Sequence, residues 1–110
     1  MQNMKIAVVI PCYKVTAHVL DVIARIGPEV SGIYAVDDCC PAGSGPHVQA
    51  HCTDPRVQVL RNAINLGVGG ATMTGYRAAV ADGYDVIVKV DGDGQMAPEL
   101  IPQFVAPIQE

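Results

Sequence analysis

Short apolar runs and amphipathic segments alternate along this chain. Residues 5–10, 32–36, 57–60 and 85–90 are mostly apolar over four to six positions, which is typical of strands buried in a sheet. Residues 17–26 and 71–81 instead carry apolar side chains at helical spacing, and short helices are expected at 47–52 and from residue 98. Because strand and helix alternate four times, we expect an α/β fold with right-handed crossovers: a doubly wound, mainly parallel sheet of about four strands, with helices on both faces.

Prolines, glycines and one threonine mark the expected ends of these elements. Pro11 ends the first strand, Thr16 is the expected N-cap of the first helix, and Pro98 begins the last helix at its favoured first position. Gly83 follows the helix at 71–81, where a left-handed residue would end it. The elements are therefore short and closely spaced.

A glycine-rich stretch, Gly67-Val68-Gly69-Gly70, lies in the loop expected at 62–70. A dinucleotide-binding fingerprint would need a third glycine where Thr72 stands, and it would follow the first strand. A P-loop would continue with Gly-Lys-Ser/Thr, which this stretch does not. We expect a tight turn into the helix at 71–81, whose small residues permit close packing on the sheet. The start of that helix would add positive potential near a diphosphate.

Two aspartates follow the last apolar run, in the pentapeptide Asp91-Gly92-Asp93-Gly94-Gln95. In extended backbone, residues i and i+2 point to the same side, so both carboxylates would face the ligand crevice at the carboxyl end of a buried strand. Such oxygen ligands suit Mg²⁺ or Mn²⁺, which keep coordination positions open for substrate phosphates. A calcium-binding EF-hand loop would need other residues at 95, 96 and 102. A polar turn with two solvated aspartates is the alternative interpretation.

Other polar residues are expected at the same edge of the sheet. Tyr13 follows the first strand, where it would stack on a base or lie as a half-buried aromatic ring. Asp37 and Asp38 follow the second strand. The carboxylate of Asp38 would accept hydrogen bonds from a ribose or a base, or would serve as an Asx-turn partner in its own loop.

Composition excludes several classes of protein. The chain has 110 residues, of which half are hydrophobic and 16% charged, as expected for one small domain with a buried α/β core. Its net charge of −4, without a Lys/Arg cluster, disfavours nucleic acid as a partner. No stretch reaches the roughly 18–20 apolar residues of a membrane helix, and no signal-peptide cleavage site follows the first apolar run, so the cytoplasm is the expected compartment.

The four cysteines form no C-x-x-C pair and are expected to be reduced thiols. One cluster contains residue types that bind zinc: Cys39, Cys40, His47, His51 and Cys52. Adjacent cysteines chelate one ion poorly, and the spacing fits no common zinc site. A zinc site is therefore disfavoured.

Four motifs in order resemble glycosyltransferase family 2. They are Val9-Ile10-Pro11-Cys12-Tyr13, Val36-Asp37-Asp38, Asn65-Leu66-Gly67 with Gly75, and Asp91-Gly92-Asp93-Gly94-Gln95. The chain is most similar to the polyprenyl-phosphate sugar transferases of that family, and the resemblance spans nearly all 110 residues. It implies the Rossmann-like N-terminal part of a glycosyltransferase-A fold.

The resemblance also implies site residues. Asp91 and Asp93 would form the D-x-D pair that binds Mg²⁺ or Mn²⁺, with Gly92 and Gln95 beside the sugar diphosphate. The residues expected to line the nucleotide pocket are Pro11, Tyr13, Val36 and Asp38.

The sequence departs from the family pattern at two positions. Val15 stands where the family often has an acidic residue, and Cys39-Cys40-Pro41 replaces a polar Gly/Ser-rich stretch. Family catalytic domains are also longer, and the half that binds the acceptor has no counterpart. Residues 1–110 are thus expected to be the nucleotide-sugar-binding donor part of a domain truncated on its C-terminal side, inactive alone and without an assignable catalytic residue.

The expected reaction is metal-dependent transfer of a sugar from a UDP- or GDP-sugar to an acceptor, which the resemblance suggests is a polyprenyl phosphate. One alternative is a nucleotidyltransferase-like enzyme, but the residues after the first strand are not the basic glycine-rich loop it would need. Another is a nucleotide-binding α/β module without turnover. The full protein would act at the inner face of the membrane in cell-envelope or polysaccharide biosynthesis, and copies would associate through the exposed strand at 85–90.

Overall fold

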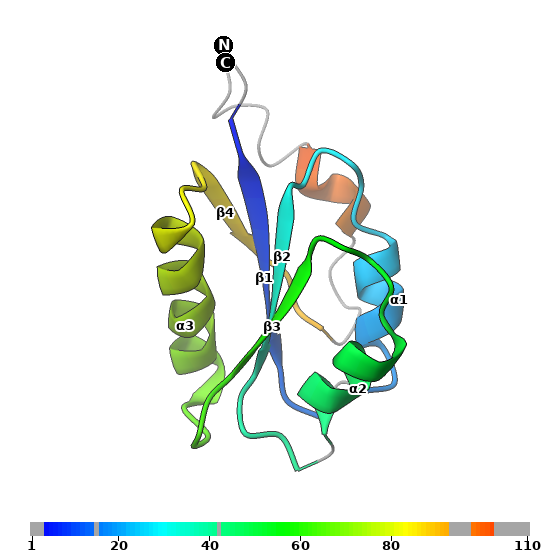
Figure 1. Cartoon of the computed structure of the whole chain (residues 1–110), viewed down its shortest axis with the longest axis vertical. Helices are drawn as coiled ribbons and strands as arrows, with labels where there is room; N and C mark the ends of the chain where they lie inside the picture. Colours follow the sequence, from blue (N-terminus) through cyan, green and yellow to red (C-terminus); the bar gives the residue numbers. More distant parts are fainter. Residues whose placement is uncertain (1–3, 15, 42, 93–97, 103–110) are drawn as a thin grey trace.

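A four-stranded parallel sheet forms the centre of the molecule in the computed structural model, which describes residues 4–14, 16–41, 43–92 and 98–102 (Figure 1). The strands are β1 (Ile6–Cys12), β2 (Gly32–Asp37), β3 (Val57–Arg61) and β4 (Val86–Lys89), in the spatial order β3-β2-β1-β4. The helices are α1 (Val19–Ala24), α2 (Ser44–His51), α3 (Gly67–Ala81) and the 3₁₀ turn η1 (Pro98–Leu100). This confirms the expected doubly wound α/β fold.

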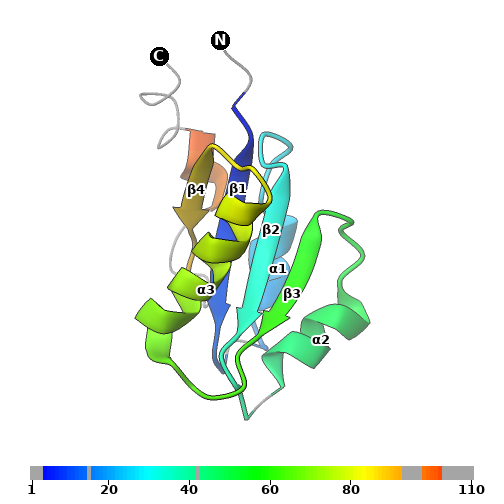
Figure 2. The ribbon, with the colours of Figure 1, turned by 60° about the vertical axis from the view of Figure 1, so that its left-hand side comes forward.

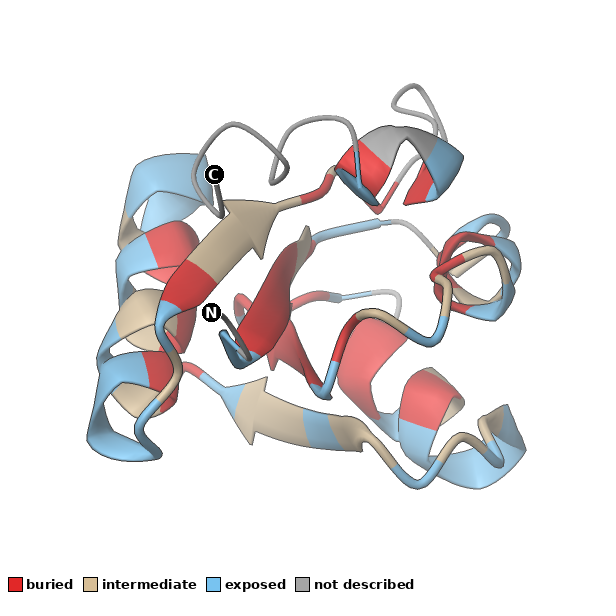
Figure 3. Ribbon diagram, turned by 90° about the horizontal axis from the view of Figure 1, so that it is seen from above, coloured by how far each residue is buried: buried red, intermediate tan, exposed pale blue. Residues whose placement is uncertain are grey.

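Side chains alternate between the two faces of the sheet and build two separate cores. On one face Val8, Ile10 and Ile33 pack with α1 and α2, and on the other Val9 and Val36 pack with α3. Figure 3 shows the buried strands between α3 on one side and α1 with α2 on the other. Since β1 and β2 are covered on both faces, their near-continuous apolar sequences are explained.

The strand β1 continues through Pro11, where the sequence predicted its end. The Val9 carbonyl accepts a hydrogen bond from the Val90 amide on the β4 side, at 2.9 Å, and the Cys12 carbonyl accepts one from the Asp38 amide on the β2 side, at 3.1 Å. The backbone polar groups of successive strand residues point to alternate sides, so the backbone nitrogen of Pro11 points toward the β4 side. Pro11 lies beyond the last β1–β4 pair, which is Val9 with Lys89. Its missing N–H therefore costs no ladder hydrogen bond.

Helix α3 begins at Gly67, four residues before the predicted start at 71, so the glycine-rich stretch is helical and not a turn. Gly67 has φ +80°, and its amide donates to the side-chain oxygen of Asn65 at 3.0 Å. At the other end Gly83 has φ +87°, which confirms the predicted left-handed ending. Gly75 confirms the predicted close packing, because an added Cβ there would collide with Val9.

The shorter helices also differ from their predicted bounds. Helix α1 begins at Val19, after a turn, and is capped by neither Thr16 nor any other side chain. Helix α2 begins at Ser44, three residues before its predicted start, because the buried carboxylate of Asp37 accepts the Gly45 amide at 3.2 Å. Pro98 begins η1, as predicted for the last helical segment.

Within the described residues, β3 and β4 are the edge strands of the sheet and no helix is long and apolar enough to cross a bilayer. Association of copies through residues 85–90 stays a prediction. The carboxyl ends of all four strands point to one end of the molecule, the lower end in Figures 1 and 2. That end is where an open α/β sheet binds ligands.

Candidate functional site

A cavity of about 570 Å³ opens at the carboxyl ends of the strands, beside the point where the strand order reverses between β1 and β4. Its volume is in the range of sites for small organic ligands. The lining residues come from the ends of β1, β2 and β4 and from the start of α3: Pro11, Cys12, Tyr13, Asp38, Asn65, Gly67, Val68, Ala71, Asp91 and Gly92. Five residues predicted for the site, Pro11, Tyr13, Asp38, Asp91 and Gly92, therefore share one cavity.

Asp38 is the buried acid of this cavity, with 2% of its surface exposed. Its Oδ1 accepts hydrogen bonds from the Asn62 side-chain amide at 2.9 Å and from the Leu66 backbone amide at 2.8 Å. These partners lie 24 and 28 residues away, so Asp38 is not a local Asx-turn residue. Among the described residues no hydrogen bond reaches its Oδ2, which leaves an acceptor for a ligand at the cavity wall.

Asp37 has a structural role on the opposite face of β2. Its Oδ1 accepts the Cys40 amide at 2.8 Å, its Oδ2 accepts the Gly45 amide at 3.2 Å, and the Arg61 Nε lies 3.9 Å from Oδ2. The carboxylate thus stabilises the start of α2. Of the two adjacent aspartates, only Asp38 lines the cavity.

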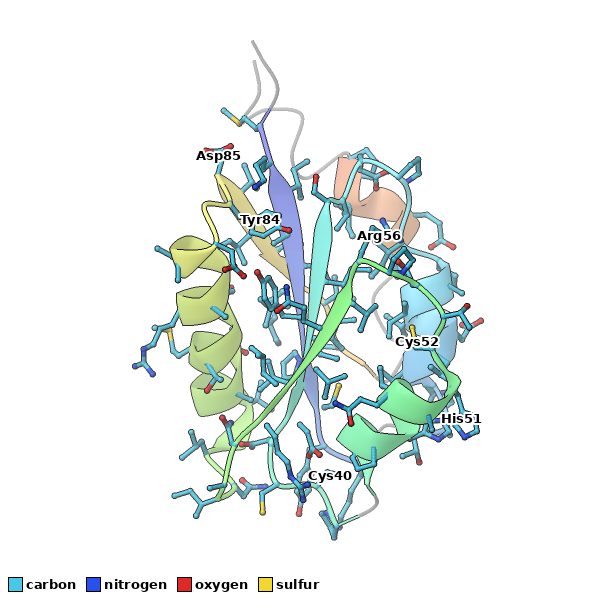
Figure 4. All side chains as sticks on the ribbon, viewed as in Figure 1. Cys40, His51, Cys52, Arg56, Tyr84 and Asp85 are labelled. Carbon is cyan, nitrogen blue, oxygen red and sulfur yellow. The ribbon has the colours of Figure 1, made fainter. Side chains whose placement is uncertain are left out.

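Tyr13 lines the cavity where β1 ends, and Lys14 follows it in the chain. Tyr13 is 42% exposed, and the Lys14 ammonium lies 5.5 Å from the centroid of its ring. Lys14 has φ +59°, a left-handed conformation that costs a lysine about 1–2 kcal/mol. Its amide donates to the Cys40 Sγ at 3.0 Å, and Cys40 lies at the lower end of the molecule in Figure 4. Cys40, one of the residues at which the sequence departs from the family pattern, therefore holds the Tyr13 loop in place.

Cys12 is an inert neighbour of Tyr13. Burial, and secondarily the charge of Asp37, raises the pKa of the Cys12 thiol to about 12. Its thiol donates to the Ile10 carbonyl at 3.3 Å. A neutral thiol at physiological pH is a poor nucleophile and a poor metal ligand.

Asp91 supplies a half-exposed carboxylate at the end of β4. The Lys89 ammonium lies 2.9 Å from its Oδ1, and 45% of the Asp91 side chain is exposed. This ion pair was not predicted, although the i, i+2 spacing of the two residues in extended backbone brings them to one side. Asp93 and Gln95 lie outside the described residues, so their predicted roles remain predictions.

The donor set at this position fits a divalent cation in part. Asp91 presents a hard oxygen ligand to the cavity, which suits Mg²⁺ or Mn²⁺ when substrate phosphates complete the coordination. Within the described ranges, no three His, Cys, Asp or Glu residues are placed to hold a metal ion. The described residues include Cys39, Cys40, His47, His51 and Cys52.

Val36 does not line the cavity. Its side chain is fully buried in the core below α3, where it lies close to Gly75. Five other lining residues were not predicted for the site: Cys12, Asn65, Gly67, Val68 and Ala71. The sequence placed only the start of the following helix near a diphosphate, whereas the convergence of the loops at the carboxyl edge of the sheet would have placed residues 65–68 there as well.

Comparison with known proteins identifies the family. The description "Glycosyl transferase family 2" matches residues 7–110. The undecaprenyl-phosphate mannosyltransferase of Micrococcus luteus is 32% identical over 109 residues, which cover 96% of this chain and 45% of that protein. The polyprenol monophosphomannose synthase of Mycolicibacterium smegmatis is 34% identical over 103 residues, covering 89% of this chain and 38% of that protein. The chain thus spans less than half the length of these relatives.

Solved structures show the same fold at low sequence identity. The S. aureus TarS structure in complex with UDP has a TM-score of 0.75 and 22% identity, and the match covers 96% of this chain and 32% of that one. Mannosyl-3-phosphoglycerate synthase from Rubrobacter xylanophilus has a TM-score of 0.70 and 20% identity, covering 98% of this chain and 37% of that one. With a family match over nearly its whole length, the chain belongs to glycosyltransferase family 2.

Proposed function

We propose that residues 1–110 form the donor-binding part of a metal-dependent glycosyltransferase, which transfers a sugar from a nucleoside diphosphate sugar to a polyprenyl phosphate. The observation that carries this proposal is the cavity at the carboxyl edge, where five predicted site residues from β1, β2 and β4 meet. The names of the relatives, which include an undecaprenyl-phosphate mannosyltransferase and a polyprenol monophosphomannose synthase, support a lipid-linked phosphate as acceptor.

The base of the nucleotide would bind at Asp38 and Tyr13. Uracil and guanine both present a ring N–H beside a carbonyl group, and the Oδ2 of Asp38 is an acceptor for such an N–H. A hydrogen bond from a neutral donor to a buried carboxylate is stronger than one between neutral groups. The exposed ring of Tyr13 would flank the base. The same two residues therefore serve UDP and GDP.

The diphosphate would lie between Asp91 and the start of α3. A fifteen-residue helix presents unpaired N–H groups and positive potential at its first turn, where Gly67 and Val68 line the cavity. Asp91, with Asp93, would hold Mg²⁺ or Mn²⁺ on the other side. The ion supplies charge neutralisation for the departing nucleotide, while Lys89 positions the Asp91 carboxylate through their ion pair.

In the proposed reaction an acceptor phosphate oxygen forms a bond to the anomeric carbon as the bond from that carbon to the diphosphate breaks. A phosphate monoester is largely dianionic at neutral pH, with a second pKa of roughly 6, so it needs no general base. Family membership favours sugar transfer over nucleotidyl transfer, and binding without turnover is the expected behaviour of the 110-residue chain alone.

Calorimetry with UDP, GDP and their sugars, each with and without Mn²⁺, tests the proposal. We expect weak binding that Mn²⁺ strengthens. Asp91→Asn and Asp93→Ala should each reduce the metal-dependent affinity at least roughly tenfold. Loss of a residue that only supports a metal ligand already reduces affinity by that factor, and these two residues would be ligands themselves. Asp21→Asn is the matched control, because Asp21 is a 73% exposed carboxylate on α1, away from the cavity lining. Metal-independent binding that neither site variant changes would refute the metal assignment.

A further inference from the structure

The mouth of the cavity carries exposed apolar side chains, and of these the proposed donor site uses only the ring of Tyr13. Four large ones lie there: Tyr13 (42% exposed), Ile64 (65%), Leu66 (48%) and Val68 (60%). Tyr13 and Val68 line the cavity from its β1 and α3 sides, and Ile64 and Leu66 belong to the connection that leads into α3. We call these four residues the apolar rim.

The apolar rim is a local concentration and not a scatter of single side chains. Seven large apolar residues are exposed in the described part of the chain, and the other three are Met4, Met73 and Val80. The backbone of the rim is held by polar contacts, since Asp38 accepts the Leu66 amide and Asn65 accepts the Gly67 amide. The Leu66 side chain lies against Gly70 in the first turn of α3 and is still 48% exposed, and Ile64 is 65% exposed. Apolar groups gathered at a site mouth mark a contact surface.

The surroundings of the apolar rim are cationic, although the whole chain has a net charge of −4. From Val57 to Ala81 the chain contains Arg61 and Arg77 and no acidic residue. The Arg61 side chain is 67% exposed at the end of β3, with its Nε 3.9 Å from the buried Asp37 carboxylate, and Lys14 is exposed beside Tyr13. The charges of the cavity acids are offset in part, because Asp38 accepts two hydrogen bonds and Asp91 is paired with Lys89.

We propose that the apolar rim docks on the surface of a bilayer that contains anionic lipids. Apolar side chains of this kind bury themselves at the boundary between headgroups and acyl chains, and neighbouring cations bind headgroup phosphates. Docking would place the cavity mouth at the membrane, where a lipid-linked phosphate could approach the donor. The biological role of this docking rests on the proposed function, whereas the docking itself is inferred from the exposed apolar and cationic surface.

Co-sedimentation of the 110-residue chain with large unilamellar vesicles tests the docking. The vesicles contain phosphatidylcholine alone or phosphatidylcholine with phosphatidylglycerol. We expect binding to the anionic vesicles that weakens as salt screens the cations. The double variant Ile64→Ser/Leu66→Ser should bind at least roughly fivefold more weakly, since two exposed apolar side chains are lost.

The double variant Met73→Ser/Val80→Ser is the matched control. Met73 (45% exposed) and Val80 (65%) are as exposed as the rim pair but lie farther along α3. Control binding should stay within roughly twofold of the wild type, because the rim is intact. Equal loss in both double variants, or no binding by the wild type, would overturn the inference. So would a rim variant that converts a self-associated chain to a monomer in light scattering, since a second copy would then cover the rim.

Donor binding separates this inference from the proposed function. Neither Ile64 nor Leu66 lines the cavity through its side chain, so the rim variant should keep its affinity for the nucleotides. Vesicle binding by a chain that binds no nucleotide would refute the proposed function and leave the docking intact. Nucleotide binding without vesicle binding would refute the docking alone.

Discussion

At the residue scale, Asp37 and Asp38 show how adjacent identical side chains take different roles. Successive residues of a strand point to opposite faces, so Asp37 meets the start of α2 and Asp38 meets the segment that leads into α3. This division follows from the period of two and could have been predicted from the sequence. The partners of Asp38 could not, because Asn62 and Leu66 reach it through a contact between distant parts of the chain.

Replacing Asp38 tests its structural role independently of any ligand. In Asp38→Ala the amides of Asn62 and Leu66 lose their acceptor, and the free energy of unfolding should fall by about 1–3 kcal/mol. Asp38→Asn keeps one acceptor oxygen and should lose less. Urea unfolding of both variants measures this, and an Asp38→Ala protein as stable as the wild type would contradict the hydrogen-bond assignment.

The position of each residue relative to the end of its strand explains which site residues could be identified from the sequence. Tyr13, Asp38 and Asp91 follow apolar strands directly, so their position at the carboxyl edge was predictable. Val36 lies one residue inside the strand, and its side chain is turned into the core by the alternation of β2. The binding roles of all these residues stay predictions until a ligand is measured.

At the scale of elements, the alternation of strands and helices and the parallel sheet were predictable, whereas helix starts were not. The apolar runs identify buried strands because both faces of the sheet are covered. The starts of α2 and α3 depend on the carboxylates of Asp37 and Asp38. Local patterns carry no information about such contacts, and this accounts for the errors of three and four residues at these helix starts.

Arg56 joins two connecting segments near the start of β3, where Figure 4 labels it. Its guanidinium donates to the carbonyls of Ile26, Gly27 and Val30 at 2.7–3.1 Å and to the carboxylate of Asp54. The connection from α1 to β2 is thus fixed to the connection from α2 to β3. Three carbonyls satisfied by one partly buried side chain make this residue sensitive to substitution.

Arg56→Met should lower the free energy of unfolding by about 2–4 kcal/mol, because those carbonyls and Asp54 lose their donor. The hydrogen bond from Arg56 holds the pKa of Asp54 below its ordinary value. The Arg56–Asp54 pair therefore contributes its full stabilisation of the folded state above the ordinary aspartate pKa of about 3.9. This stabilisation is lost as the pH falls through the lowered pKa of Asp54.

Urea unfolding as a function of pH measures both effects. The difference between wild type and Arg56→Met should be largest near neutral pH and should shrink in acid as Asp54 is protonated. Arg77→Met is the control, since no described residue forms an ion pair with Arg77. A difference that grows in acid would contradict the assignment of the pair.

At the scale of the whole molecule, the two ends of the sheet differ in chemistry. The carboxyl end carries the cavity, the buried Asp38 and the apolar rim. The other end carries a packed aromatic cluster, in which the Tyr34 hydroxyl donates to Asp82, the rings of Tyr34 and Tyr84 meet edge to face, and Lys5 lies over the Tyr84 ring at 4.8 Å. Tyr84 and Asp85 lie at that end in Figure 4. One end is thus open to ligands and the other is closed by side chains.

We propose above all that a nucleotide binds at the carboxyl end of the sheet. Backbone amide chemical shifts of the 110-residue chain, recorded while UDP or GDP is added with Mg²⁺, test this binding site. We expect shift changes that gather at Tyr13, Asp38, Gly67 and Gly92. Changes gathered at the aromatic cluster around Tyr84, or in the separate cavity beside His51 and Asp54, would contradict it.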